Sequence, residues 1–75
     1  MKELASYISI DAEIRFGKPC IAGTRIAVSD ILQWLASGMS VNGILQDYPV
    51  LKEDHIRAAL TFAADRESMI KIIAA

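Results

Sequence analysis

The chain has 75 residues, of which 53% are hydrophobic, and its formal net charge is −1 at pH 7. Its one cysteine excludes an internal disulfide and its one histidine leaves no ligand set for a metal, so association with a second chain is the expected source of extra stability for so small a domain. The near-neutral charge does not by itself indicate nucleic-acid or membrane binding, and no apolar run has the length of a membrane span or a signal-peptide core, so we expect a cytoplasmic protein without a cofactor.

The first part of the chain predicts a small β element. Two short extended pieces, residues 19–21 and 25–28, are joined by a turn in which Gly23 is the expected hinge. A ribbon of two such short strands is not stable alone. We therefore expect a third strand, either residues 7–10 or the same hairpin of a second copy, and in the second case Ile21 and Ile26 would line a dimer interface.

Three helices are predicted after the β element. Ser29 is the expected N-cap of a helix over residues 29–37, which Gly38 ends. Ser40 is expected to cap a second helix, and Pro49 ends that helix near Tyr48. A third helix is expected to begin near Glu53 and to continue toward the C-terminus.

The third helix is expected to bury one stripe of side chains at helical spacing: Ile56, Ala59, Leu60 and Ala63, with Phe62 beside them. Three helices with short connections are typical of a helix-turn-helix core. The predicted fold is mainly α, with a helix-turn-helix domain over residues 1–66 that includes a short N-terminal β hairpin, followed by an apolar tail over residues 67–75.

Several motifs occur in an order that resembles one known family. They are Gly17-Lys18-Pro19-x-Ile21-x-Gly23-Thr24-Arg25-Ile26-x-Val28, then Asp47-Tyr48-Pro49-x-Leu51, then Ile56-x-Ala58-Ala59-Leu60. Together they resemble the antitoxin-like family labelled domain of unknown function 433. The resemblance implies a homeodomain-like helix-turn-helix with a small β element, paired with a ribonuclease-like toxin of the PIN type and without enzyme activity. The chain departs from the family pattern at Lys52, where a threonine or serine usually opens the third helix, and at Asn42-Gly43, which replaces an acidic pair.

The basic residues of the first part form the one cationic cluster, Arg15, Lys18 and Arg25. Such a cluster can bind phosphates, or it can be a solvated face held by internal ion pairs. Asp47 favours the second interpretation, because a carboxylate in the last turn of a helix opposes the helix dipole and needs a compensating cation. We therefore predict an ion pair between Arg25 and Asp47.

The third helix would read DNA in this fold, but its exposed face carries two carboxylates, Glu53 and Asp54, near its start. His55 and Arg57 are the remaining candidates for contacts with bases or phosphates. For His55, an ordinary boundary position is the alternative interpretation. Cys20 has no base at a defined spacing, so we expect it to be a small core residue and not a nucleophile.

Apolar residues outside the predicted core are candidates for a partner interface. Trp34 is expected in the core or at a dimer interface. The tail is too apolar for a free end, so it is expected to contact either a second copy or a groove of the toxin, through Met69, Ile70, Ile72 and Ile73.

These patterns predict a homodimeric, antitoxin-like protein that acts by stoichiometric binding to a PIN-like toxin, with its helix-turn-helix on promoter DNA. It is expected to have no small-molecule substrate, no membrane partner and no catalytic residue. The alternative is a protein-interaction or dimerisation module without a nucleic-acid role.

Overall fold

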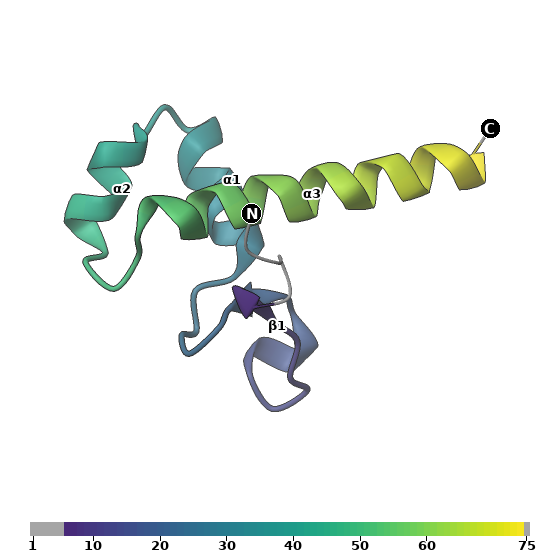
Figure 1. Cartoon of the computed structure of the whole chain (residues 1–75), viewed down its shortest axis with the longest axis horizontal. Helices are drawn as coiled ribbons and strands as arrows, with labels where there is room; N and C mark the ends of the chain where they lie inside the picture. The colour runs from purple at the N-terminus through teal and green to yellow at the C-terminus, as the bar shows by residue number, and fades with distance from the viewer. Residues whose placement is uncertain (1–5, 75) are drawn as a thin grey trace.

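The computed structural model describes residues 6–74, with side chains as far as residue 66. A two-residue strand and a left-handed turn precede a second short strand, and three helices complete the chain (Figure 1). In chain order the elements are β1 (Ile8–Ser9), η2 (Arg15–Gly17), β2 (Cys20–Ile21), α1 (Val28–Ala36), α2 (Val41–Asp47) and α3 (Glu53–Ala74). The predicted mainly helical fold with a short N-terminal hairpin is confirmed.

The third strand comes from the chain itself. β1 pairs with β2 in antiparallel orientation, with Ile8 opposite Ile21. On its other edge β2 meets the segment before α1, where Cys20 bridges to Ala27 and the Ile21 amide donates to the Ile26 carbonyl at 2.9 Å. Of the two sources considered for the third strand, the structure therefore uses residues 8–9.

The start of α1 differs from the prediction. The helix begins at Val28, with Ala27 at the N-cap, and Ser29 lies inside the first turn. The prediction that Ser29 caps this helix is therefore wrong. The residue at the N-cap is an alanine, which has no side-chain acceptor. Instead the carboxylate of Asp30, three residues into the helix, accepts the Ala27 amide at 3.0 Å, which is the half of a capping box that the third helical residue supplies.

The cap and the end of α2 are confirmed. Ser40 accepts the Gly43 amide at 3.0 Å, and the chain leaves helical geometry at Tyr48 before Pro49.

α3 begins at Glu53 as expected. It then continues through residue 74, so the predicted tail and the predicted domain share one helix, which extends past the rest of the fold in Figure 1. No helix in the described part of the chain is both long and apolar enough to cross a membrane.

One hydrophobic core joins β2 to all three helices. Its largest fully buried side chains include Ile21, Ile31, Ile44 and Ile56. Trp34 packs against this core half-buried, and its ring stacks on that of Tyr48 at 4.3 Å between centroids. The described residues thus bury one continuous core despite the small size of the chain.

The buried stripe of α3 is only partly as predicted. Ile56 and Ala59 are buried, but Leu60 is 46% exposed and Ala58 is buried in its place. α3 packs mainly against α1. Helical periodicity favours the larger Leu60, but the fold covers the face of α3 that carries Ala58 and leaves Leu60 exposed.

Candidate functional site

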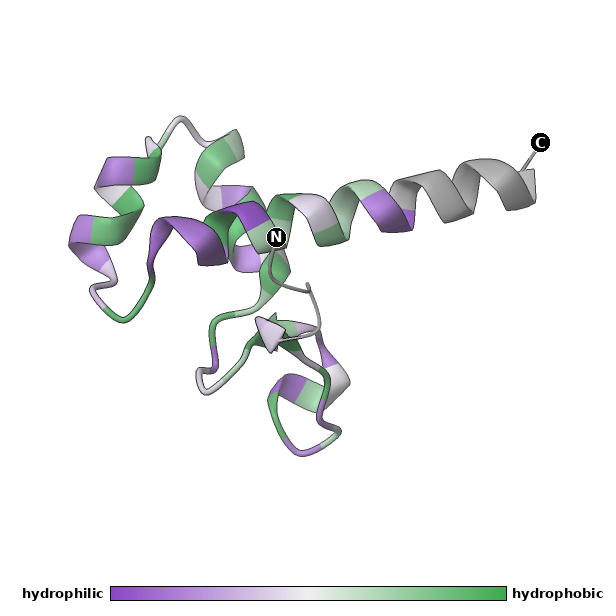
Figure 2. Cartoon of the chain, viewed as in Figure 1, coloured by the Kyte–Doolittle hydropathy of each residue, from purple (hydrophilic) through white to green (hydrophobic). Residues whose placement is uncertain are grey.

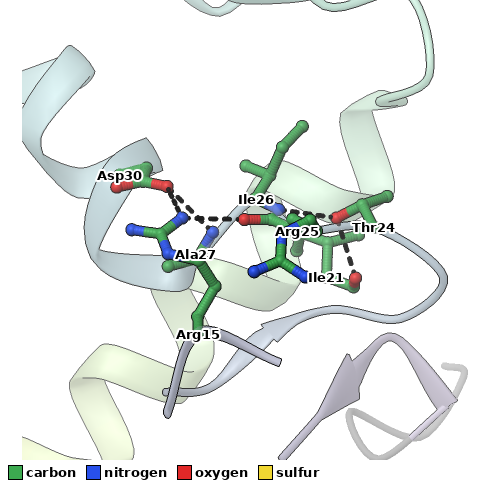
Figure 3. A network of polar contacts seen from close by, with 7 residues as sticks. All are labelled: Arg15, Ile21, Thr24, Arg25, Ile26, Ala27 and Asp30. Carbon is green, nitrogen blue, oxygen red and sulfur yellow. Dashed lines mark hydrogen bonds and ion pairs between the residues drawn. The ribbon is translucent and has the colours of Figure 1, made fainter. Parts of the chain in front are cut away.

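Arg15, the first member of the predicted basic cluster, is committed to contacts within the chain. Its Nη1 donates to the Arg25 carbonyl at 2.8 Å and to Oδ2 of Asp30 at 3.0 Å (Figure 3). The arginine and aspartate side chains are each about 70% buried, at 32% and 28% exposure. Arg15 therefore ties the turn before β2 to the first turn of α1.

Asp30 is the acceptor at the centre of this network. The same Oδ2 accepts the Ala27 amide and the Arg15 guanidinium. Burial raises the pKa of the Asp30 carboxyl, but the hydrogen bonds from Arg15 and Ala27 and the charges of Arg15 and Lys18 outweigh that effect, so the net pKa is lowered. The hydrogen bond to Asp30 in turn raises the pKa of Arg15.

The other two members of the cluster form no ion pair with any described residue. Within the described residues the ion pairs are Arg15 with Asp30 and Arg57 with Glu53. The predicted pair between Arg25 and Asp47 is wrong, because Arg25 lies in the turn after β2 and takes part in the network through its carbonyl alone. Lys18 and Arg25 are exposed, so the structure leaves two of the three cations available.

His55 and Arg57, the two residues of α3 predicted to contact bases or phosphates, both make contacts within the chain. His55 Nδ1 accepts the Lys52 amide at 2.9 Å, and its ring meets Tyr7 edge-on at 5.5 Å. In α1 the side chain of Asp30 likewise accepts a backbone amide three residues before it. The His55 side chain thereby caps the start of α3, where Lys52 has no side-chain acceptor. Arg57 forms an exposed pair with Glu53 at 3.3 Å, one helical turn away. Exposed pairs of this kind contribute about 0.3–0.5 kcal/mol, so Arg57 can exchange this partner for another anion.

A groove between α1 and α3 was not anticipated from the sequence. It is open and has a volume of about 470 Å³. Its walls are mainly apolar and include two cations, Lys18 before β2 and Arg66 on α3. Arg66 lies over the Phe62 ring, 5.4 Å from its centroid. The i,i+4 spacing of Phe62 and Arg66 is the sequence signal from which this contact could have been predicted. The lining residues are Lys18, Pro19, Val28, Ser29, Leu32, Phe62, Ala63 and Arg66.

Two residues before Lys18, which lines this groove, the chain presents Phe16, which is 100% exposed. Arg15, Phe16 and Gly17 all have positive φ, at 53°, 58° and 82°. Left-handed backbone is natural for glycine and costly for the other two residues. We call residues 11–17, which carry this turn, the Phe16 loop.

The predicted interface residues have different environments. Ile21 is fully buried in the chain's own core, so it cannot contact a partner, and Ile26 and Trp34 pack half-buried against that core. The side chains of Met69, Ile70, Ile72 and Ile73 lie outside the described residues.

Cys20 is 1% exposed, as expected of a core residue. Among the described residues, no three histidine, cysteine or carboxylate side chains come together as a metal site.

Comparison with known proteins gives a family and a structural relative. Residues 8–63 match the model of DUF433, described as a protein of unknown function. The fold is similar to the crystal structure of a DUF433 member protein from Anabaena variabilis, with a TM-score of 0.77, 26% sequence identity, and coverage of 96% of this chain and 72% of that one. No curated protein matches the sequence.

Proposed function

Because the chain belongs to the DUF433 family, we propose that it is an antitoxin-like protein that works by stoichiometric binding to a PIN-type ribonuclease toxin and to the DNA of a shared promoter. The observation that carries the DNA half is the pairing of α2 with α3 across the turn at Pro49, the arrangement of a helix-turn-helix reader. The toxin half rests on the family resemblance of the sequence motifs. The cytoplasm, where promoter DNA is found, is part of the same proposal.

The DNA contacts in this proposal differ from the cluster first considered. Arg15 is held by Asp30, and His55 by the cap of α3. Arg57 and Lys52 are exposed on and beside the first turn of α3, where a helix-turn-helix protein places its reading residues. Lys18 and Arg25 remain available for phosphates away from that helix.

We further propose that the protein acts without turnover. The chain has one histidine and one cysteine, and both have structural roles. His55 Nδ1 is occupied by the Lys52 amide, and Cys20 is buried in β2. Histidine and cysteine are common carriers of general acid–base and nucleophilic chemistry, and in this chain neither side chain is free for that role.

The experiment is a fluorescence anisotropy titration with a labelled duplex taken from the region upstream of the protein's own gene. Binding through phosphate contacts predicts an affinity that falls steeply as salt is raised. The titration is run with the protein alone and with any chain that co-purifies with it. No binding at low salt in either case would reject the DNA half of the proposal.

A second function is favoured by a specific observation. The first turn of α3 carries Glu53 and Asp54, and Figure 2 shows this start of the helix as strongly hydrophilic. Carboxylates at that position repel DNA phosphates. A protein-interaction module without a nucleic-acid role is therefore the alternative, and it predicts partner binding that does not depend on DNA.

A further inference from the structure

Phe16 is an unusually prominent surface residue. Its ring is fully exposed, and its backbone is left-handed at φ 58° between Arg15, at φ 53°, and Gly17. Both the exposed ring and the backbone conformation are unfavourable in an isolated chain. Strained positions of this kind persist where the surrounding structure fixes them and are concentrated at binding sites.

The contacts that fix this turn are on the other side of the loop. Arg15 is anchored to Asp30 and to the Arg25 carbonyl (Figure 3), and the Gly17 amide donates to the Ile14 carbonyl at 3.2 Å. The backbone that carries Phe16 is therefore fixed before any partner arrives. An aromatic side chain has only two side-chain torsions to order on binding, and aromatic residues are common as interface anchors.

The sequence that follows Phe16 contributes to the groove between α1 and α3. Lys18 and Pro19, two and three residues after Phe16, form one of its walls. Phe62, Leu32 and Val28 contribute much of its apolar lining. An exposed apolar anchor and an open apolar groove thus belong to one surface patch.

We propose that this patch binds a second copy of the chain, in a two-fold dimer in which Phe16 of each copy enters the α1–α3 groove of the other. A two-fold interface requires the same patch to contain both the projecting group and the site that receives it. The proximity of Phe16 to Lys18 and Pro19 meets that requirement.

The charges around the two features are complementary. The Phe16 loop carries the exposed carboxylates Asp11 and Glu13, and the groove carries the exposed cations Lys18 and Arg66. When the loop of one copy covers the groove of the other, opposite charges come together at the rim. Such pairs at an interface rim set orientation and disfavour other arrangements.

This dimer does not depend on DNA or on a toxin, so its failure would leave the proposed function standing. Equally, DNA binding by a monomer would not support the dimer. The patch also differs from the interface expected from the sequence, in which Ile21 and Ile26 of two hairpins would meet. Ile21 is buried, whereas Phe16 is available.

The test is sedimentation equilibrium of the full chain over a wide concentration range. Phe16→Ala should raise the dissociation constant of the dimer at least about tenfold, because both anchors are lost at once. Val50→Ala is the matched control, since Val50 is 58% exposed on the turn between α2 and α3, away from the Phe16 loop in Figure 1. The control should dimerise as the wild type does.

A charge exchange tests the arrangement without removing apolar surface. Glu13→Lys and Lys18→Glu should each weaken the dimer, and the double variant should recover most of the wild-type affinity. A wild type that stays monomeric, or a Phe16→Ala dimer as tight as the wild type, would overturn the proposal. So would a double variant no better than the singles, or a Phe16 that binds a different protein while the chain remains a monomer.

Discussion

Arg15 and Asp30 connect the Phe16 loop to the start of α1 through a hydrogen-bonded ion pair of 3.0 Å. The same Asp30 oxygen caps the helix by accepting the Ala27 amide, and the same Arg15 nitrogen holds the Arg25 carbonyl. One carboxylate therefore serves both a helix terminus and a strained turn. Arg15, which the sequence offers as a phosphate contact, therefore stabilises the fold instead.

Asp30→Ala should destabilise the fold by about 1–2 kcal/mol, because it removes a helix cap and leaves the half-buried Arg15 guanidinium without its anion. For a domain of this size that is a decrease in Tm of roughly 4–16 °C, measurable by circular dichroism. Asp47→Ala is the control, since Asp47 makes no ion pair with another described residue and opposes the α2 dipole. It should be neutral or slightly stabilising, and equal losses in the two variants would contradict this account.

The lowered pKa of Asp30 predicts how stability depends on pH. A carboxyl with a pKa lower in the folded than in the unfolded chain stabilises the fold above the unfolded value of about 3.9, and this stabilisation is lost as pH falls through the folded value. Urea unfolding of the wild type and Asp30→Asn should therefore differ most at neutral pH. The difference should shrink below about pH 4, and a constant difference across this range would count against the charged pair.

His55→Ala should destabilise α3 by about 1 kcal/mol, because the Lys52 amide loses its acceptor at the helix start. His55→Glu should recover much of the loss, since a glutamate at this helical position makes the same reach-back in a capping box. Thermal unfolding of the three proteins checks this. If the glutamate variant is no more stable than the alanine variant, the role of His55 as a cap is wrong.

Phe16→Gly should stabilise the monomer by up to about 1.5 kcal/mol. The left-handed backbone costs a residue with a Cβ about 1–2 kcal/mol, and the extra entropy of glycine in the unfolded chain offsets about 0.4–1 kcal/mol of the gain. Phe16→Ala is the control, because it removes the ring and keeps the Cβ. Urea unfolding at low protein concentration should rank the glycine variant above the alanine variant, and the reverse order would exclude strain at this position.

Arg57→Ala and Lys52→Ala should each weaken DNA binding and reduce the magnitude of the salt slope by about one. Arg15→Ala should leave the slope unchanged when measured on folded protein, because Arg15 is already neutralised by Asp30. Anisotropy titrations at several salt concentrations give all three slopes. A large change for Arg15 and none for Arg57 would move the DNA contacts back to the first part of the chain.

Local sequence signals predicted much of the helical framework. The Ser40 cap, the break before Pro49 and the start at Glu53 each depend on a few adjacent residues, and each is confirmed. The cap of α1 was missed because its acceptor, Asp30, lies inside the helix and not before it. The choice between Ala58 and Leu60 depends on which face of α3 the rest of the fold covers, and helical periodicity alone does not specify that face.

The candidate site was harder to predict, because its contacts join residues far apart in the sequence. Arg15 and Asp30 are 15 positions apart, and no spacing rule connects them. Arg25 and Asp47 were paired on charge alone, and the fold keeps them apart. The exposure of Phe16 follows from three left-handed residues in a row, a conformation that only Gly17 announces in the sequence.

Above all, we propose that the protein binds a ribonuclease-like toxin stoichiometrically. Its most direct test is purification of the untagged protein from its native source, followed by mass-spectrometric identification of every chain in the complex and of their ratio. We expect a small ribonuclease-like chain at a fixed ratio to this one. A complex that contains copies of this chain alone would contradict it.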